Sequence, residues 1–337
     1  MYVYKNEQGQ IQGLAAVHID VILYCGEAEF HEKVIDKLIA SYVIGKVEKE
    51  KFTFTGWDLK QSGHEIVIQQ SGFTDRLDLS RFDKLDLSEQ NKDTVLPDEL
   101  QQLFRSLVGA IGWVSQVSRP DRAAHQVYLS INLGKATFGD AKQALRIIRN
   151  VKDSPQTIKF SNLGNLSEAK LLCWSDSSFG KQKAQTVNGV ILFVQGQNKK
   201  MNVLDWNAQK MQVPVTSPLS GECEAALEGY SRIKWIRSLY EEIVGKQAVR
   251  AVIRTDSKSL VSSINSAAQV KDKRAMVCVA TLRAIYQHDD VEIIWTPGST
   301  NIADHLTKTT TNGNILRKLL EGEAWKPSDE EESANNS

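Results

Sequence analysis

The order of strands and helices in the second half of the chain limits most strongly how it can fold. Three apolar stretches with the composition of strands come first, at 169–175, 186–195 and 201–207, followed by a long helical pattern over 217–244. Strands and helices then alternate: a strand at 248–254, helices at 258–266 and 273–287, a strand at 291–296 and a helix over 302–320 that is interrupted near Gly313. Consecutive strands pair antiparallel, whereas strands joined through helices pair in parallel. We therefore predict an α/β fold with a mixed five-stranded sheet and flanking helices.

Four acidic residues stand where such a sheet brings strand ends and helix starts together. Asp176 ends the apolar run Leu171–Ser175, Asp256 follows the fourth strand, and Asp304 lies near the start of the last helix. The fourth is Glu224, in the first turns of the long helix. The apolar stripe of that helix (Cys223, Leu227, Tyr230 and Ile233) predicts that Glu224 faces the sheet and that Glu222 points outward.

A half-buried group of four carboxylates predicts a metal site. The negative charges would repel one another by about several kcal/mol unless a cation lay between them. Oxygen ligands suit Mg²⁺, or Mn²⁺ as the alternative, and argue against zinc. Two such ions can activate a water molecule and stabilise the leaving oxygen in phosphodiester cleavage. We therefore predict Asp176, Glu224, Asp256 and Asp304 as catalytic residues and as the ligands of two Mg²⁺ ions.

The composition of the chain says more about its cellular location than about its function. The 337 residues carry no net charge, so nucleic-acid binding would depend on local basic patches. The four cysteines are isolated, which indicates a reducing, intracellular location, cytoplasmic or nuclear. We see no signal peptide and no apolar run of membrane-spanning length, and we expect no membrane association.

The sequence of the first half predicts a hairpin, short strands and four helices. The hairpin pairs the strand around Val3 with the apolar run 14–25; helical patterns cover 27–42, 100–117, 121–133 and 139–151, and short strands lie near 52–57 and 65–68. Loop chemistry between 154 and 167 indicates the main boundary. We expect domains at 1–158 and 168–322, and a disordered acidic tail at 327–337.

Four motifs of the second half surround these acids: Trp174-Ser175-Asp176, Ser220-Gly221-Glu222-Cys223-Glu224-Ala225, Thr255-Asp256-Ser257 and Ala303-Asp304-His305-Leu306-Thr307-Lys308. Through them the second half resembles the ribonuclease H domain of copia-type retrotransposon Pol polyproteins. The second motif is similar to the family's Ser-Thr-Glu-Ala-Glu-Tyr, whose second glutamate is the metal ligand. The resemblance thus implies a ribonuclease H-like sheet with Asp176, Glu224, Asp256 and Asp304 as its metal ligands.

The first half resembles the end of the reverse transcriptase of the same polyproteins. The motifs Phe104-Arg105-Ser106-Leu107-Val108-Gly109-Ala110 and Ser118-Arg119-Pro120-Asp121 are similar to segments that join the two enzymes. Val17-His18-Ile19-Asp20-Val21-Ile22-Leu23 is similar to the metal-binding hairpin of the polymerase palm, with Val21 in place of the second aspartate. The resemblance implies a truncated palm, thumb and connection region. Its polymerase site, Asp20 with Val21, is degenerate, and we predict that no DNA synthesis remains.

The resemblance implies an endoribonuclease that cleaves the RNA strand of RNA–DNA hybrids. Hybrids are recognised through groove shape, 2′-hydroxyls and phosphates. Residues placed to bind them are Ser177, Ser178, Lys181, Lys183, Asn188, Lys271, Lys273 and Arg274. Because the apolar hairpin would lack its usual cover, we expect the first half to be loosely packed, to self-associate, to bind a missing reverse-transcriptase region or to dock on the second half.

Two alternatives remain open. One is a catalytically inactive or domesticated Pol remnant that acts only by binding nucleic acid or another protein, because the polymerase motif has already lost an aspartate. The other is a nuclease of the same fold that prefers DNA, which Asp304 disfavours because integrases place a glutamate at the last acidic position. Hybrid cleavage in Mg²⁺, compared between the wild-type protein and Asp176→Asn, separates the remnant from the enzyme.

Overall fold

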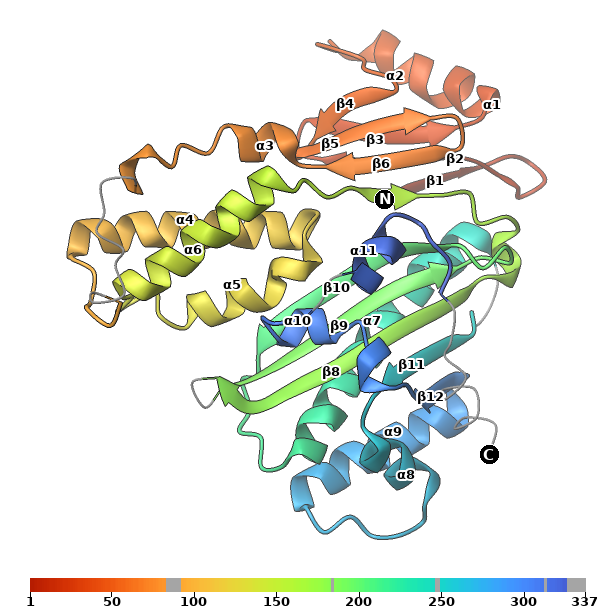
Figure 1. Cartoon of the computed structure of the whole chain (residues 1–337). Coiled ribbons are helices and arrows are strands. Elements are labelled where there is room, and N and C mark those ends of the chain that lie inside the picture. Colours follow the sequence, from red (N-terminus) through yellow and green to blue (C-terminus); the bar gives the residue numbers. More distant parts are fainter. Residues whose placement is uncertain (83–91, 183–184, 246–248, 312–313, 326–337) are drawn as a thin grey trace.

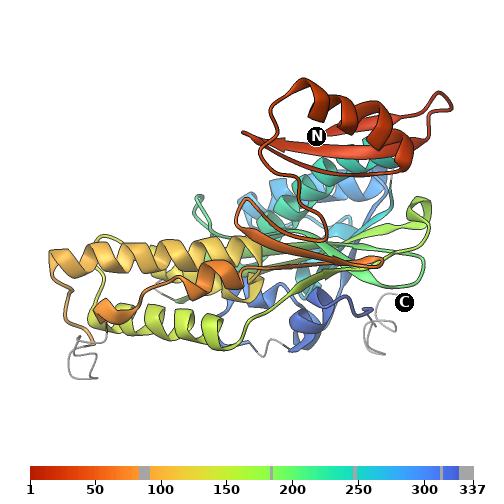
Figure 2. The ribbon, with the colours of Figure 1, turned by 90° about the horizontal axis from the view of Figure 1, so that it is seen from above.

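The computed structural model describes residues 1–82, 92–182, 185–245, 249–311 and 314–325. A mixed five-stranded sheet forms the second half of the chain, and smaller sheets and a group of helices form the first half (Figure 1). Seen from above, the helices of the first half project to one side of the five-stranded sheet (Figure 2). Among the described residues, no helix combines the length and the apolar character needed to cross a bilayer.

The five-stranded sheet has the order β10-β9-β8-β11-β12. Its strands are β8 (Lys170–Gln182), β9 (Gln185–Gln195), β10 (Met201–Lys210), β11 (Ala251–Thr255) and β12 (Val291–Trp295). The first three strands pair antiparallel, whereas β11 runs parallel to both β8 and β12. The prediction of a mixed five-stranded sheet with flanking helices is confirmed.

Helices cover both faces of this sheet. They are α7 (Pro218–Val244), α8 (Lys258–Asn265), α9 (Lys273–His288), α10 (Asp304–Thr307) and α11 (Asn314–Leu320). Side chains alternate along β8: Leu171 and Cys173 pack with α7, α8 and α9, whereas Leu172 and Trp174 pack with α10 and α11. The sheet is therefore the middle layer of a three-layer arrangement, and its strands are apolar on both faces.

Helix α7 begins and ends at residues suited to the two ends of a helix. The Ser217 hydroxyl accepts a hydrogen bond from the Ser220 N–H, and Pro218 occupies the first helical position, where a missing N–H costs nothing. Gly245 ends the helix with φ 72°, a left-handed conformation that glycine adopts without strain. Gly229 lets α7 approach the sheet closely, since a Cβ there would lie 3.0 Å from Cys173 Sγ.

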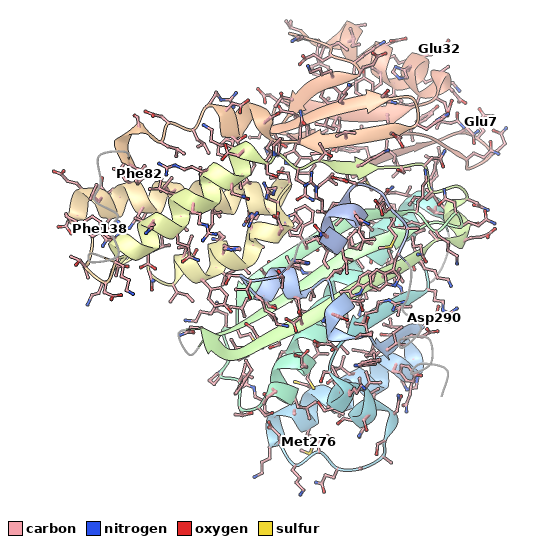
Figure 3. All side chains as sticks on the ribbon, in the orientation of Figure 1. Glu7, Glu32, Phe82, Phe138, Met276 and Asp290 are labelled. Carbon is pink, nitrogen blue, oxygen red and sulfur yellow. The ribbon has the colours of Figure 1, made fainter. Side chains whose placement is uncertain are left out.

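The first half contains two antiparallel sheets and a helical layer. Strands β1 (Tyr2–Lys5), β2 (Ile11–His18) and β3 (Val21–Gly26) form one sheet, against which α1 (Ala28–Phe30), a π-helical turn (His31–Ile35) and α2 (Asp36–Ser41) pack. Strands β4 (Lys51–Phe54), β5 (Trp57–Ser62), β6 (Glu65–Gln69) and β7 (Ile158–Phe160) form the other. The helices are α3 (Ser71–Asp75), α4 (Asp98–Val117), α5 (Ala123–Ser130) and α6 (Phe138–Asp153). Phe82 and Phe138 lie at the far end of this helical layer (Figure 3).

The predicted N-terminal hairpin is present, and part of its surface is apolar and exposed. β2 is the central strand of its sheet and β3 is an edge. Ile19, in the turn between them, is 88% exposed, and Val17, Val21 and Ile22 are also exposed. Among the described residues, β3 is therefore hydrogen-bonded to a neighbouring strand on one side only.

The helical layer packs directly on the five-stranded sheet. Helix α5 lies against β10 and α10, and the turn Pro120–Arg122 lies against α10 as well. Trp206 Nε1 on β10 donates a hydrogen bond of 2.7 Å to the Ser115 carbonyl of α4. The described residues of the first half thus dock on the second half through α4 and α5.

Some predicted element limits differ from the structure. β8 continues through Asp176 to Gln182 instead of ending at Ser175, because Ser175 to Ser178 keep their pairing with β9. The helix predicted over 302–320 is divided into α10 and α11, with non-helical backbone from Lys308 to Thr311. Gly313 and the acidic tail at 327–337 lie outside the described residues.

Candidate active site

Three acidic side chains meet beside β8 and β11, two neighbouring inner strands of the helix-covered sheet. One carboxylate oxygen each of Asp176, Glu222 and Asp256 lies within 4.8 Å of the other two. The strand register brings the two aspartates together, because β8 and β11 are parallel neighbours with Trp174 paired to Arg254. Asp176 and Asp256 each lie two residues beyond that pair, Asp176 within β8 and Asp256 directly after β11, so the two aspartates lie at the same level of the sheet. Asp176 is only 2% exposed.

Glu222 supplies the third carboxylate from the second turn of α7. It is 9% exposed and heads a buried row that continues through Ala225, Ala226 and Gly229. This spacing of three, four and seven residues defines one face of a helix. The Glu222 carboxylate also accepts a hydrogen bond of 3.4 Å from the Thr255 hydroxyl of β11.

The prediction that Glu224 joins the cluster was wrong. Glu224 points toward α9, where its carboxylate lies 3.9 Å from Arg274 Nε and accepts a weak 3.5 Å hydrogen bond from Cys278 Sγ. The error came from judging the helix face by its large residues, Leu227 and Tyr230, which are only half-buried. Near Glu222 small residues mark the contact face, because Gly229 and the two alanines at 225 and 226 let this part of α7 lie close to the sheet.

Asp304 approaches the cluster from α10 together with Lys308. Lys308 Nζ lies 2.5 Å from Asp304 Oδ1 and 3.6 Å from Asp176 Oδ2. Burial raises the pKa of Asp304 to about 6, and the negative charge of Asp176 contributes to the rise. The structure therefore brings three of the four predicted acids, Asp176, Asp256 and Asp304, into one neighbourhood and replaces the fourth, Glu224, with Glu222.

The electrostatics of the cluster fit a divalent cation. Burial raises the pKa of Glu222 well above its usual range, and the charges of Asp176 and Asp256 raise it further. Burial and the charge of Asp176 also raise the pKa of Asp256. Neighbouring carboxylates that resist ionisation in this way are stabilised by a cation between them. The donors are all oxygen atoms, the ligands that Mg²⁺ and Mn²⁺ prefer.

Hydrogen bonds from the last elements orient the strand that carries Asp176. The Thr307 hydroxyl of α10 donates to Asp176 Oδ2, and Asn301 Nδ2 donates to the Ser175 carbonyl at 3.2 Å. Thr307 is fully buried. Sequence reasoning had singled out Asp304 in this segment, but it gave no role to the Thr307 hydroxyl.

The predicted nucleic-acid-binding residues fall into two groups. Ser178 and Asn188 are buried, with 2% and 5% exposure, and Ser178 Oγ lies 3.0 Å from the Tyr128 hydroxyl. The prediction that these two residues bind the hybrid is contradicted by their burial. Ser178 faces α5, whereas Asn188 lies on the opposite face of the sheet from its neighbour Val187, which packs on α5. Lys271 and Lys273 are exposed at the start of α9, and Arg274 is half-buried beside Glu224.

The other predicted residues near the first aspartate are less informative. Ser177 is half-buried on β8, and a Cβ on Gly221 of α7 would meet its hydroxyl at 2.5 Å. Lys181 continues β8, and Lys183 lies outside the described residues. In the first half, Asp20 stands in the exposed turn between β2 and β3, followed by Val21 as the first residue of β3.

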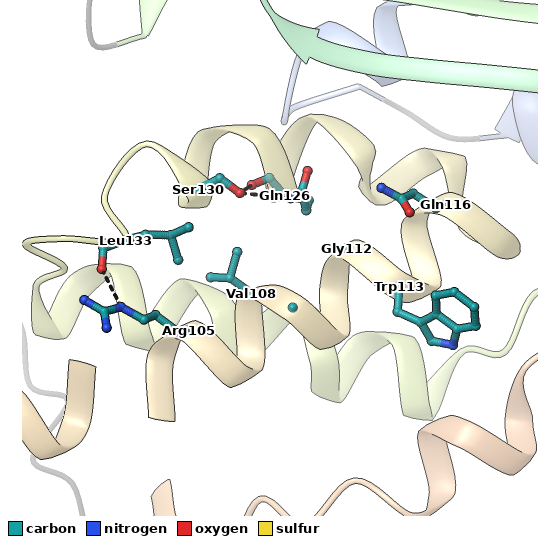
Figure 4. A pocket seen from close by; sticks show the side chains of 9 residues that line it. Arg105, Val108, Gly112, Trp113, Gln116, Gln126, Ser130 and Leu133 are labelled. Carbon is teal, nitrogen blue, oxygen red and sulfur yellow. Dashed lines mark hydrogen bonds between the residues drawn. The ribbon is translucent and has the colours of Figure 1, made fainter. Parts of the chain in front are cut away.

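A separate groove of about 470 Å³ lies between α4 and α5, away from the acidic cluster (Figure 4). Gly109 and Gly112 line it without side chains, and Trp113 and Gln116 lie at one end. At the other end, Arg105 Nε donates a 3.1 Å hydrogen bond to the Leu133 carbonyl. None of its lining residues belongs to the acidic cluster.

Comparisons with known proteins show related arrangements at low identity. LC11-RNase H1, isolated from compost and solved with an RNA/DNA hybrid, is 16% identical over 41% of this chain and 93% of that chain, with a TM-score of 0.33. RNase H1 from the archaeon Halobacterium salinarum is 14% identical over 40% and 90%, with a TM-score of 0.31. Foamy viral protease-reverse transcriptase with an RNA/DNA hybrid is 12% identical over 84% and 36%, with a TM-score of 0.49. No family model and no curated protein matches the chain.

The strand order and directions define the fold class independently of these scores. Three antiparallel strands are followed by two parallel ones, with the first strand in the middle of the sheet. This is the ribonuclease H-like arrangement that the sequence resemblance implied. The chain therefore has an α/β fold with a ribonuclease H-like mixed five-stranded sheet.

Proposed function

We propose that the chain is a ribonuclease H-type endonuclease that hydrolyses the RNA strand of RNA–DNA hybrids and leaves 5′-phosphate and 3′-hydroxyl ends. The observation that carries the proposal is the meeting of Asp176, Glu222 and Asp256 within 4.8 Å, beside the inner strands of a ribonuclease H-like sheet. A structural role explains this cluster poorly, since two buried acids and a half-buried one weaken a fold unless a cation neutralises them.

Asp176, Glu222, Asp256 and Asp304 would hold Mg²⁺, with Mn²⁺ as the alternative. Two bound ions would supply an activated water and charge stabilisation at the leaving oxygen. The chain's own residues set the geometry: the Thr307 hydroxyl orients Asp176, and the Thr255 hydroxyl bonds to Glu222. Lys308 neutralises part of the negative charge of Asp304 and Asp176 from one side of the acidic cluster.

The hybrid would be bound through its shape and phosphates. Recognition of this kind needs no base-reading motif and no strong net charge, in agreement with a chain whose net charge is zero. Lys271 and Lys273 are exposed beside α9 and suit phosphate contacts. Ser177, Lys181, Lys183 and Arg274 remain part of the proposed binding surface.

The motifs of the sequence support a copia-type retrotransposon origin. The Ala303–Lys308 motif is close to the family's ending, and the Phe104–Ala110 and Ser118–Asp121 segments are similar to its connecting region. In this proposal the first half descends from a reverse transcriptase and makes no DNA, because Val21 replaces an aspartate that metal binding requires. We propose an intracellular location, cytoplasmic or nuclear.

The test is cleavage of a labelled RNA–DNA hybrid by the purified chain. We expect Mg²⁺-dependent cutting of the RNA strand by the wild-type protein, none in EDTA, and none by Asp176→Asn. A DNA duplex of the same sequence should stay intact. Cleavage of the DNA duplex in preference to the hybrid would favour the DNA nuclease, and the absence of cleavage in every sample would favour the inactive remnant.

A further inference from the structure

A tyrosine from the first half of the chain reaches the neighbourhood of the acidic cluster. Tyr128, on α5, is 6% exposed. Its hydroxyl donates a 3.0 Å hydrogen bond to the Thr307 carbonyl, a residue 179 positions later in the chain. The same oxygen lies 3.0 Å from Ser178 Oγ on β8. One phenol thus connects α5, α10 and the strand that bears Asp176.

The contact continues to the cluster through a single residue. Thr307 receives the Tyr128 hydrogen bond at its carbonyl and donates its own hydroxyl to Asp176 Oδ2. Ser178, the second partner of Tyr128, stands two positions after Asp176 on the same strand. Tyr128 therefore contacts both the residue that donates to the Asp176 carboxylate and a side chain two positions further along the same strand.

The surroundings of Tyr128 make this contact rigid. Ala124, Val127 and Val187 pack around it in a small buried cluster between α5 and β9. Because Thr307 is fully buried, water cannot replace the tyrosine at its carbonyl. Loss of the phenol oxygen would leave that carbonyl and the Ser178 hydroxyl with one partner fewer.

We infer that Tyr128 is a positioning residue of the metal site: it holds Thr307, and through Thr307 the Asp176 carboxylate, in the orientation that binds the cation. The inference rests on the proposed function, since it concerns the same site. It assigns to a helix outside the ribonuclease H-like sheet a part in the nuclease. Groups that orient metal ligands commonly change metal affinity by about 10- to 100-fold when removed.

The experiment measures Mn²⁺ binding to the full chain by titration calorimetry, together with the melting temperature. We expect Tyr128→Phe to weaken Mn²⁺ binding by about 3- to 10-fold and Thr307→Val by about 10-fold or more, whereas Thr307→Ser keeps the hydroxyl and stays near the wild type. Tyr240→Phe is the matched control. Its hydroxyl also donates to a backbone carbonyl, that of Leu166, and it should leave Mn²⁺ binding unchanged.

The double variant Tyr128→Phe/Thr307→Val decides whether the tyrosine acts through Thr307. If it does, the double variant binds Mn²⁺ no more weakly than Thr307→Val alone. A Tyr128→Phe variant that melts earlier but binds Mn²⁺ like the wild type would overturn the inference and leave the proposed function standing. A wild-type protein that binds no Mn²⁺ would overturn both.

Discussion

The Thr307 hydroxyl donates a hydrogen bond to the carboxylate of Asp176, 131 residues earlier in the chain. This bond joins a four-residue helix, α10, to the strand at the centre of the sheet. Gly189 of β9 makes the approach of α10 feasible: it pairs with Asp176 and presents no side chain to the helix. The geometry of the acidic cluster thus depends on close packing over β9.

Gly189→Ala should destabilise the protein. A Cβ at this position would lie 2.6 Å from Leu306 Cβ and 2.9 Å from Thr307 Cγ2, so α10 must move. We expect a loss of about 1–3 kcal/mol in the free energy of unfolding, the usual cost of overpacking, measured by urea denaturation. Gly109→Ala on α4 is the control. It has open space around it and should be neutral or stabilising, since alanine favours helix.

Glu222→Gln and Glu224→Gln form a matched pair that tests the assignment of the ligand. They lie two residues apart on α7 and change the same group, but only Glu222 faces Asp176 and Asp256. We expect Glu222→Gln to lower hybrid cleavage by at least about 100-fold and Glu224→Gln to change it by less than about 3-fold. Rates measured in saturating Mg²⁺ decide between them. Equal losses in both variants would contradict the assignment.

This pair also shows how far the sequence could go. The order of strands and helices predicted the sheet, and the position of an acid directly after an apolar run identified Asp176 and Asp256, because both follow from local patterns, although β8 continues past Asp176. The face of α7 that contacts the sheet was predicted wrongly, because it depends on the distance between the helix and the sheet. The sequence signal for this face was the row of small residues Ala225, Ala226 and Gly229, which are buried, whereas Leu227 and Tyr230 are only half-buried.

Other features of the site could not be predicted because they arise from contacts between distant segments. Nothing near Tyr128 in the sequence indicates that its hydroxyl bonds to Thr307, 179 residues away. Ser178 follows the site in sequence, but the packing of α5 against the sheet encloses it. Residue type and spacing identify candidate ligands, whereas burial by another part of the chain determines which side chains a substrate can reach.

Asp304→Asn should stabilise the metal-free protein at neutral pH. Because the pKa of Asp304 is raised to about 6 in the folded state, the native protein holds this proton more tightly than the unfolded chain. Its contribution to stability is therefore present at low pH and lost as the pH rises through about 6. In EDTA we expect the variant to exceed the wild type by about 1–2 kcal/mol at pH 7.5 and by little at pH 4.5.

Melting curves in EDTA at the two pH values measure this difference. Addition of Mg²⁺ at pH 7.5 should raise the melting temperature of the wild type more than that of the variant, because the cation neutralises a repulsion to which the Asp304 carboxylate contributes and the neutral amide does not. A wild-type protein that gains stability relative to Asp304→Asn as the pH rises would contradict the electrostatic account.

Asp121→Asn should destabilise the contact between the helical layer and the sheet. Arg119 Nε and Asp121 Oδ1 lie 2.8 Å apart, with side-chain exposures of 5% and 17%. Burial alone would raise the pKa of Asp121, but the hydrogen bond and charge of Arg119 outweigh it, and the pKa is lowered. Neutralising Asp121 leaves the buried guanidinium without its counter-charge. The expected loss is about 3 kcal/mol in the free energy of unfolding.

Two comparisons test this result. Glu29→Gln removes the same charge from an exposed pair with Lys33 and should cost less than about 0.5 kcal/mol. Because a lowered folded-state pKa stabilises only the ionised form, the contribution of Asp121 is present above pH 4 and lost as the pH falls further. The difference between the wild type and Asp121→Asn should therefore shrink below pH 4. A difference that stays constant down to pH 2 would mean that the ion pair contributes nothing and that Asp121 acts through its shape alone.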